Sequence, residues 1–417
     1  MAGRVSRRVI AAVTALGLAI GLGACAPTPE RIDIGVDQVD GALPADLATQ
    51  MQTLTETAMT SVGASGAIVS VSVPWSGEWV AGLGTSGAGG PKVDPSMTFK
   101  SANVTRAMTC DLLYALVKKG TVRLDDTVGD WLDAYPGQAS ITLGDLCDGR
   151  SGLAGYMSRI FSRVVAAPDR VWNPRELVAY GIARPTTAQP GAEFGDSDTG
   201  YVLLGLALER AGGESLADLY REYVFQPLGM SSSSYPAGVG GGDRLTGGYI
   251  PNGKDRKPEC SEPTDVTAVT SSVGAASGGV VSTVGDLSTY VRALAVGARP
   301  YDADTRYADP RPANSDQPTW FTADGGTYQA GSLVGQFGSL AGYMVAAFAD
   351  RTTGMSVVVV LNDSRASANA VRVLAWQLAA LASKAPAADG RTAPEMGLPW
   401  TAESLAPELA RYAICGG

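Results

Sequence analysis

Segments with the composition of β-strands lie near the two ends of this chain of 417 residues, and a long stretch rich in helices and loops separates them. Two segments at the N-terminal end and three at the C-terminal end combine β-branched or aromatic residues with flanking turn residues: 66–73, 79–83, 328–334, 343–348 and 355–361. Turn residues at 74–77 predict that the first two form a hairpin. We therefore expect an α/β fold of the α+β type, in which both chain ends build one antiparallel sheet flanked by helices.

Apolar residues at every fourth position predict a buried helix that starts at Asn103 and ends before Gly120. A surface helix is expected before the first hairpin, at residues 47–62. The clearest further helices are expected at 201–208, 216–224 and 287–294, with a closing helix marked by apolar residues between 371 and 381. The middle of the chain is therefore expected to be an inserted, mainly helical lobe.

The first residues have the features of an export signal. Arginines at the start precede an apolar run at 9–24 that is too short to span a bilayer comfortably. The run ends in Leu-Gly-Ala-Cys at 22–25, which resembles the bacterial lipobox and implies a lipid on Cys25. The alternative is a chance cysteine after an ordinary cleavage site. Paired arginines leave both general and twin-arginine export open.

These features divide the chain into a signal peptide (1–24), a tether (25–46), a folded domain (47–385) and a C-terminal extension (386–417). The protein is expected in the cell envelope, anchored through Cys25 to the outer face of the cytoplasmic membrane. Removal of the signal peptide takes three of the 32 basic residues and none of the 41 acidic ones, which leaves a net charge of −12. This charge disfavours nucleic acid as a partner.

Four further cysteines remain after Cys25, namely Cys110, Cys147, Cys260 and Cys415. An even number in an oxidising compartment permits two disulfides with three possible pairings. We favour Cys110 with Cys147 and Cys260 with Cys415, and free buried thiols are the alternative.

The chain contains no histidine. Its absence excludes the Ser-His-Asp and Cys-His catalytic systems and most zinc sites, because each of these needs an imidazole as base or ligand. The sequence also lacks a G-x-S-x-G elbow and a Walker phosphate-binding motif. We therefore predict neither a metal site nor a cofactor.

The segment Phe99–Arg106 (FKSANVTR), followed by the predicted helix and by GTVRLDDTV at 120–128, resembles the serine β-lactamase family, in its class C-like branch. This family includes penicillin-binding proteins and D-alanyl-D-alanine carboxypeptidases. Further matches follow in family order at 151–153, 190–191, 201–205, 227–230, 278–287 and 335–343. The resemblance implies a sheet lobe (47–100 and 295–385), a helical lobe (101–294) and an active site between them.

The residues that carry the family's chemistry are replaced here. The resemblance places Asn103 where the nucleophilic serine belongs and Arg106 where the lysine belongs, and no S-x-x-K occurs elsewhere in the chain. A carboxamide has no ionisable hydroxyl, and a guanidinium cannot serve as a base. Asp196 takes the place of the family's tyrosine, and Gln336 that of a histidine or lysine on a strand. No catalytic residue of the family is therefore expected to be intact.

Part of the site is expected to survive as a binding site. The resemblance implies an oxyanion hole made by the main-chain N–H groups of Asn103 and Ser339. We expect Asp196 and Asp198 to balance the charge of Arg106. The predicted ligand-binding residues are Asn103, Arg106, Asp196, Asp198, Gln336, Gly338 and Ser339.

The sequence predicts an inactive member of this family that binds a peptide or peptidoglycan-derived ligand, or scaffolds another envelope protein. If the protein is a scaffold, the polar side chains of the site bond to one another in a closed cleft and the protein acts through its outer surface. The alternative is an active esterase, carboxypeptidase or amidase in which Asp196 or Asp198 activates water, which requires a raised carboxyl pKa. We expect the neighbouring Arg106 to lower that pKa instead.

Overall fold

The structure, a computed structural model, describes residues 31–235, 243–253, 255–261, 263–314 and 316–415. The predicted signal peptide, Cys25 and the first part of the predicted tether lie outside these residues. Among the helices in the described part of the chain, none has the length and apolar character needed to cross a bilayer.

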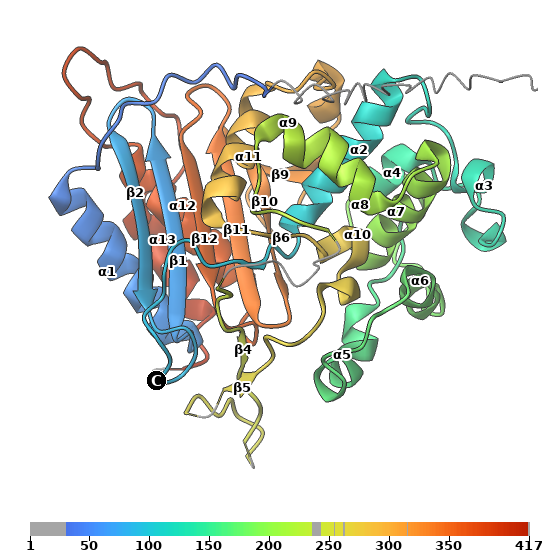
Figure 1. Ribbon diagram of the computed structural model, residues 1–417, viewed down its shortest axis with the longest axis horizontal. Helices are drawn as coiled ribbons and strands as arrows, with labels where there is room; N and C mark the ends of the chain where they lie inside the picture. The colour runs from blue at the N-terminus through green and yellow to red at the C-terminus, as the bar shows by residue number, and fades with distance from the viewer. Residues whose placement is uncertain (1–30, 236–242, 254, 262, 315, 416–417) are drawn as a thin grey trace, which may run out of the picture. The chain divides into compact units, whose positions relative to one another are not determined.

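An eight-stranded antiparallel sheet forms the centre of the fold, and its strands come from both ends of the chain (Figure 1). In spatial order the strands are β2 (Gly77–Gly84), β1 (Gly66–Val73), β12 (Ser356–Leu361), β11 (Tyr343–Asp350), β10 (Leu333–Leu340), β9 (Thr327–Ala330), β8 (Phe321–Asp324) and β7 (Arg311–Pro312). The N-terminal hairpin joins the C-terminal strands through β1 and β12, where Ala67 lies opposite Leu361. The expected sheet built from both chain ends is confirmed.

Helices cover both faces of the sheet. One face packs against α1 (Ala45–Val62) and α12 (Asn369–Ala382), and α13 (Ala402–Arg411) packs on α12. The other face packs against α2 (Val104–Lys118) and α11 (Val284–Val296). Successive side chains of a strand point to opposite faces, so Ile68 packs with the second group and Val69 with the first. Every residue of β1 and β12 is buried, which explains why neither strand contains a charged residue.

The segment between β2 and α11 forms the helical lobe, which agrees with the expected insertion (Figure 1). Its helices are α3 (Val128–Trp131), α4 (Leu143–Cys147), α5 (Met157–Ala166), α6 (Pro174–Ile182), α7 (Asp198–Gly212), α8 (Leu216–Tyr220), α9 (Gln226–Leu228) and α10 (Ala275–Gly278). A π-helical turn at Arg221–Phe225 joins α8 to α9. Two small sheets pair β3 (Phe99–Lys100) with β6 (Val281–Ser282) and β4 (Gly248–Tyr249) with β5 (Thr264–Asp265).

One strand prediction was wrong. Residues 328–334 form the end of β9 and the start of β10 rather than a single strand. A two-residue turn at Gly331 and Ser332 reverses the chain between the paired residues Ala330 and Leu333. Gly331 has a φ of 56°, a left-handed conformation that glycine adopts without a steric penalty.

The segments that flank the predicted domain lie against it. The N–H of Ile32 donates to the carbonyl of Pro227 at 2.8 Å, and the N–H of Leu43 donates to that of Glu78 at 3.0 Å. The C-terminal extension contributes α13, which packs against α12. Residues 31–44 and 386–415 are therefore packed parts of the described structure.

Both favoured disulfides are present. Cys110 on α2 is joined to Cys147 at the end of α4, and Cys260 is joined to Cys415 near the C-terminus. The pairing prediction is confirmed, and the alternative of free thiols is wrong.

Candidate functional site

The buried helix α2 begins at the boundary between the sheet and the helical lobe. The N–H of Ser101 donates to the carbonyl of Val280 at 2.9 Å, and its hydroxyl donates to the same oxygen at 3.0 Å. Ala102 follows with a φ of 48°, a left-handed conformation that is uncommon for a residue with a side chain. Asn103 then caps the helix without a side-chain hydrogen bond to it. The chain therefore turns sharply into α2 and presents Asn103 at its N-terminus.

Asn103 lies directly against β10. A methyl group placed on Gly338 would approach the Asn103 Cγ to 2.2 Å, so only glycine fits at this position. The N–H of Phe337 donates to Gln336 Oε1 at 2.9 Å. This N–H therefore points to the edge of β10 that faces β9, beyond the last residue paired with β9. Main-chain groups alternate in direction along a strand, so the N–H of Ser339 points to this same edge. This geometry suits the predicted oxyanion hole.

Arg106 is brought together with both predicted aspartates. Its Nη1 donates to Asp196 Oδ1, its Nη2 lies 2.7 Å from Asp198 Oδ1, and its guanidinium lies 4.9 Å from the centre of the Tyr201 ring. The side chain of Arg106 is only 2% exposed, whereas that of Asp196 is 56% exposed. Ser197 caps α7 by accepting the Gly200 N–H at 3.1 Å, which holds Asp198 in the first turn.

The charged groups in this cluster shift one another's pKa values. Burial disfavours the charged form of Arg106, but the carboxylates of Asp196 and Asp198 outweigh burial and raise its pKa further above its ordinary value. Burial raises the pKa of Asp198, and the lowering by Arg106 does not cancel this effect. Arg106 lowers the pKa of Asp198 as expected, but the net shift of that pKa is upwards because desolvation dominates.

Gln336 is not part of this cluster. Its Nε2 donates to the carbonyl of Gly326 at 3.1 Å, its Oε1 accepts the Phe337 N–H, and the residue is 4% exposed. Both polar groups therefore hold the turn between β8 and β9 against β10. A role for Gln336 as a ligand donor would require breaking these bonds.

Ser277 on α10 is a site residue that the sequence did not predict. Its hydroxyl accepts a hydrogen bond from Arg106 Nε at 3.1 Å and lies 3.5 Å from Asp198 Oδ1, where it donates. The residue is 3% exposed, so the hydroxyl serves the ion-pair cluster and is not presented to a ligand. Ser277 directly precedes the family match at 278–287, but that match does not include it.

A cavity of about 810 Å³ lies beside the cluster. Asp196 and Glu193 line it together with four aromatic side chains: Phe194, Phe321, Tyr328 and Phe337. Ser367, Ala368 and Asn369, at the start of α12, also line it. Of the predicted ligand-binding residues, Asp196 is the one whose atoms form this wall in the described structure. The sequence did not predict the cavity.

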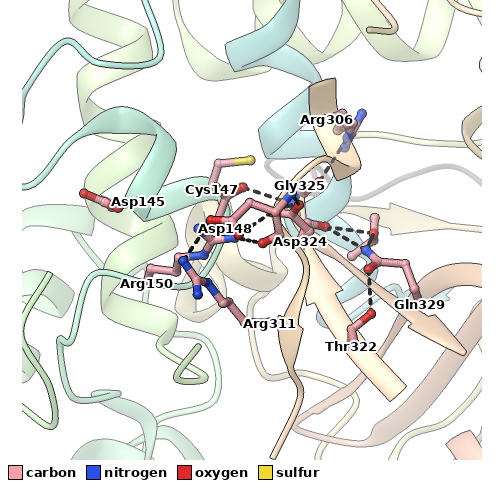
Figure 2. A network of polar contacts seen from close by, with 12 residues as sticks. Asp145, Cys147, Asp148, Arg150, Arg306, Arg311, Thr322, Asp324, Gly325 and Gln329 are labelled. Atoms are coloured by element: carbon pink, nitrogen blue, oxygen red, sulfur yellow. Dashed lines mark hydrogen bonds and ion pairs between the residues drawn. The ribbon is translucent and has the colours of Figure 1, made fainter. Parts of the chain in front are cut away.

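A second polar network joins the end of α4 to the strands next to the cavity (Figure 2). Arg150 lies 2.8 Å from Asp309 Oδ2 and 3.0 Å from Asp324 Oδ1, and the N–H of Gly325 donates to Asp148 at 3.0 Å. Burial, followed by the negative charge of Asp324, raises the pKa of Asp148 to about 7. Among the described residues, no group of three or more cysteine and carboxylate side chains is placed to hold a metal ion.

A sheet built from both chain ends, an inserted helical lobe and a polar cluster at the N-terminus of the helix between them define a β-lactamase-like serine hydrolase fold. The profile of the family described as Beta-lactamase matches residues 51–382. The chain therefore belongs to the β-lactamase family, as the sequence resemblance implies.

Curated relatives match shorter parts of the chain. Penicillin-binding protein 4* of Bacillus subtilis (strain 168) is 30% identical over 139 residues, which cover 32% of this chain and 30% of that protein. The D-alanyl-D-alanine-carboxypeptidase/endopeptidase AmpH of Escherichia coli (strain K12) is 30% identical over 141 residues, or 32% of this chain and 36% of AmpH. The matches thus span about a third of these relatives.

Solved structures share the fold over a longer range. A D-stereospecific amidohydrolase from Streptomyces sp. has a TM-score of 0.66 at 22% identity, over 77% of this chain and 95% of its own. The D-amino acid amidase from Ochrobactrum anthropi SV3, complexed with L-phenylalanine, has a TM-score of 0.66 at 22% identity, over 78% and 93%. These similarities establish the fold.

Proposed function

We propose that this protein is a catalytically inactive member of the β-lactamase family that binds a peptide or peptidoglycan-derived ligand without cleaving it. The observation that carries this proposal is the buried cluster in which Arg106 is ion-paired to Asp196 and Asp198. A permanently charged guanidinium held by two carboxylates cannot accept a proton from a nucleophile.

Asn103 completes the argument. It lies half-buried at the N-terminus of α2 against Gly338, where a nucleophile of this fold would meet the oxyanion hole. The amide nitrogen is not nucleophilic because its lone pair is delocalised, so no acyl-enzyme forms through it. The main-chain donors of Asn103 and Ser339 do not depend on side-chain identity, and they support binding of a carbonyl or carboxylate group.

A second candidate function is hydrolysis by a carboxylate that activates water. The raised pKa of Asp198 favours it, because a more basic carboxylate is a better general base near neutral pH. Against it, one oxygen of Asp198 accepts hydrogen bonds from Arg106 and Ser277. We therefore keep this as the alternative.

Intact-mass measurement after exposure to a penicillin, a cephalosporin and an activated ester tests the proposal. We expect no mass increase that depends on the site at Asn103 in the native protein, because the family's nucleophile and base are absent there. The Asn103→Ser and Arg106→Lys double variant, which restores the hydroxyl and the amine, is the matched comparison. An acyl adduct on the native protein that Asn103→Ala abolishes would overturn the proposal. Ester turnover that survives Asn103→Ala but not Asp198→Asn would establish the alternative.

A further inference from the structure

Four aromatic rings form one wall of the cavity beside the cluster, and Tyr328 lies at their centre. Its ring centre lies 5.5 Å from that of Phe194, 5.2 Å from that of Phe321 and 4.9 Å from that of Phe337. Asp196, two residues after Phe194, lines the same cavity as the rings, and its side chain is 56% exposed. An apolar group that enters the cavity would therefore meet rings and a carboxylate together.

The same part of the cavity carries excess negative charge. Arg106 supplies one positive charge against the two carboxylates of Asp196 and Asp198, and Glu193 adds a further carboxylate to the lining. No ion pair of Glu193 occurs among the described residues. A carboxylate that faces a partly enclosed cavity attracts cations more strongly than one in open water.

The opposite wall does not reverse this balance. Arg311 lines the cavity, but its Nη2 lies 2.9 Å from Asp309, which also pairs with Arg150. The two carboxylates of Asp309 and Asp324 balance the two guanidinium groups of Arg150 and Arg311. Figure 2 shows both arginines beside Asp324. This wall therefore brings no excess positive charge into the cavity.

Arg372 on α12 is also ion-paired, and its contacts with two of the rings determine which rings are available to a ligand. Its guanidinium lies 4.9 Å from the centre of the Phe321 ring and 5.5 Å from that of Phe337, and its Nη2 lies 2.7 Å from Glu408. Phe321 and Phe337 thus already contact a cation. Phe194 and Tyr328, which adjoin Asp196, are the rings left for a cationic group of a ligand.

We infer that this cavity binds an organic ammonium group carried on an apolar body, with the ammonium between Asp196, Glu193 and the rings of Phe194 and Tyr328. Aromatic faces and carboxylates are the two environments that attract such a cation after it has left water. The inference rests on the proposed function, since the ligand is held without acylation, and it names the chemistry of that ligand.

Isothermal titration with three probes of similar shape tests the inference: 2-phenylethylammonium, its neutral N-acetyl derivative and the anion 3-phenylpropanoate. We expect the cation to bind about tenfold or more tightly than either other probe, because it alone satisfies the carboxylates. Glu193→Gln should weaken binding of the cation severalfold and leave the neutral probe unchanged, and Tyr328→Leu should weaken binding of the cation more than that of the neutral probe.

Glu56→Gln, the same change on the exposed face of α1, is the control and should leave all three affinities unchanged. Equal affinity for the cation and the neutral probe, tighter binding of the anion, or no binding of any probe would overturn the inference. None of these results bears on acylation, which the mass measurement decides, so the two proposals fail separately.

Discussion

At the scale of single residues, Asn103 and Gly338 pack against each other without room for a further methyl group. An added methyl at Gly338 would lie 2.5 Å from the Asn103 Cβ as well as 2.2 Å from its Cγ. Neither backbone has room to move, because α2 is buried and β10 is paired with β11. The position tolerates glycine alone as long as residue 103 carries a side chain.

We therefore predict that Gly338→Ala lowers the free energy of unfolding by about 1–3 kcal/mol, the usual cost of overpacking. Adding Asn103→Gly should recover part of this loss, because it removes both clashing atoms. Chemical denaturation of the two single variants and the double variant measures the coupling. Gly137→Ala, at a position with open space, is the control. Equal stability of Gly338→Ala and the native protein would show that the contact is not tight.

At the scale of elements, the end of α4 is attached to the turn between β8 and β9 through Asp148 and Gly325. The pKa of Asp148 is raised to about 7, so the folded protein binds more protons than the unfolded chain between about pH 4 and pH 7. Its contribution to stability is complete below about pH 4 and is lost as the pH rises towards 7.

Asp148→Asn should flatten this dependence, since the amide oxygen still accepts the Gly325 N–H without ionising. Between about pH 5 and about pH 8, we expect the melting temperature of the native protein to fall further than that of Asp148→Asn. Asp125→Asn, at an exposed carboxylate, should behave like the native protein. Parallel pH profiles for the native protein and Asp148→Asn would contradict the assignment.

The elements that sequence periodicity predicts are those with a continuous apolar pattern. The stripe from Val104 to Leu116 predicts α2. Runs of β-branched residues predict β1 and β12, and a run of aromatic and small apolar residues predicts β11. Residues 328–334 contain the pair Gly331-Ser332, which favours a two-residue hairpin turn, and the prediction of a single strand does not take this signal into account. β7 and β8 were not predicted, because two- and four-residue strands carry too few side chains to show a period.

At the scale of the whole molecule, the Cys260–Cys415 disulfide joins the loop after β4 to the C-terminal end, across 155 residues. The N–H of Cys415 also donates to the carbonyl of Ser61 on α1 at 3.0 Å. The C-terminal segment is therefore held to α1 by this hydrogen bond and to the loop between β4 and β5 by the disulfide.

Replacing both cysteines by serine should lower the free energy of unfolding by about 2–4 kcal/mol, because the unfolded chain gains the freedom of a long loop. Denaturation of the native protein and of the Cys260→Ser and Cys415→Ser double variant measures this loss. Added reductant should destabilise the native protein more than the double variant. A double variant as stable as the native protein would show that the bond is dispensable.

The ion-pair cluster and the cavity differ in how far the sequence predicts them. Arg106, Asp196 and Asp198 occupy positions that the family pattern brings together, so their pairing could be predicted. The cavity is lined by segments around residues 194, 311 and 368, which no motif connects. The orientation of Gln336 was not predictable either, because it depends on the turn at Gly326.

The cluster around Arg106 also restricts how the sequence can evolve. Replacing Arg106 with an uncharged residue would leave Asp196 and Asp198 facing each other, and neutralising either aspartate would unbalance a largely buried cation. Asn103→Ser lies outside the cluster and Arg106→Lys keeps the positive charge, so these two changes leave the charges balanced. The family's tyrosine at position 196 would instead remove one of the two carboxylates that hold Arg106. The loss of either member of this ion pair therefore favours a later change of the other.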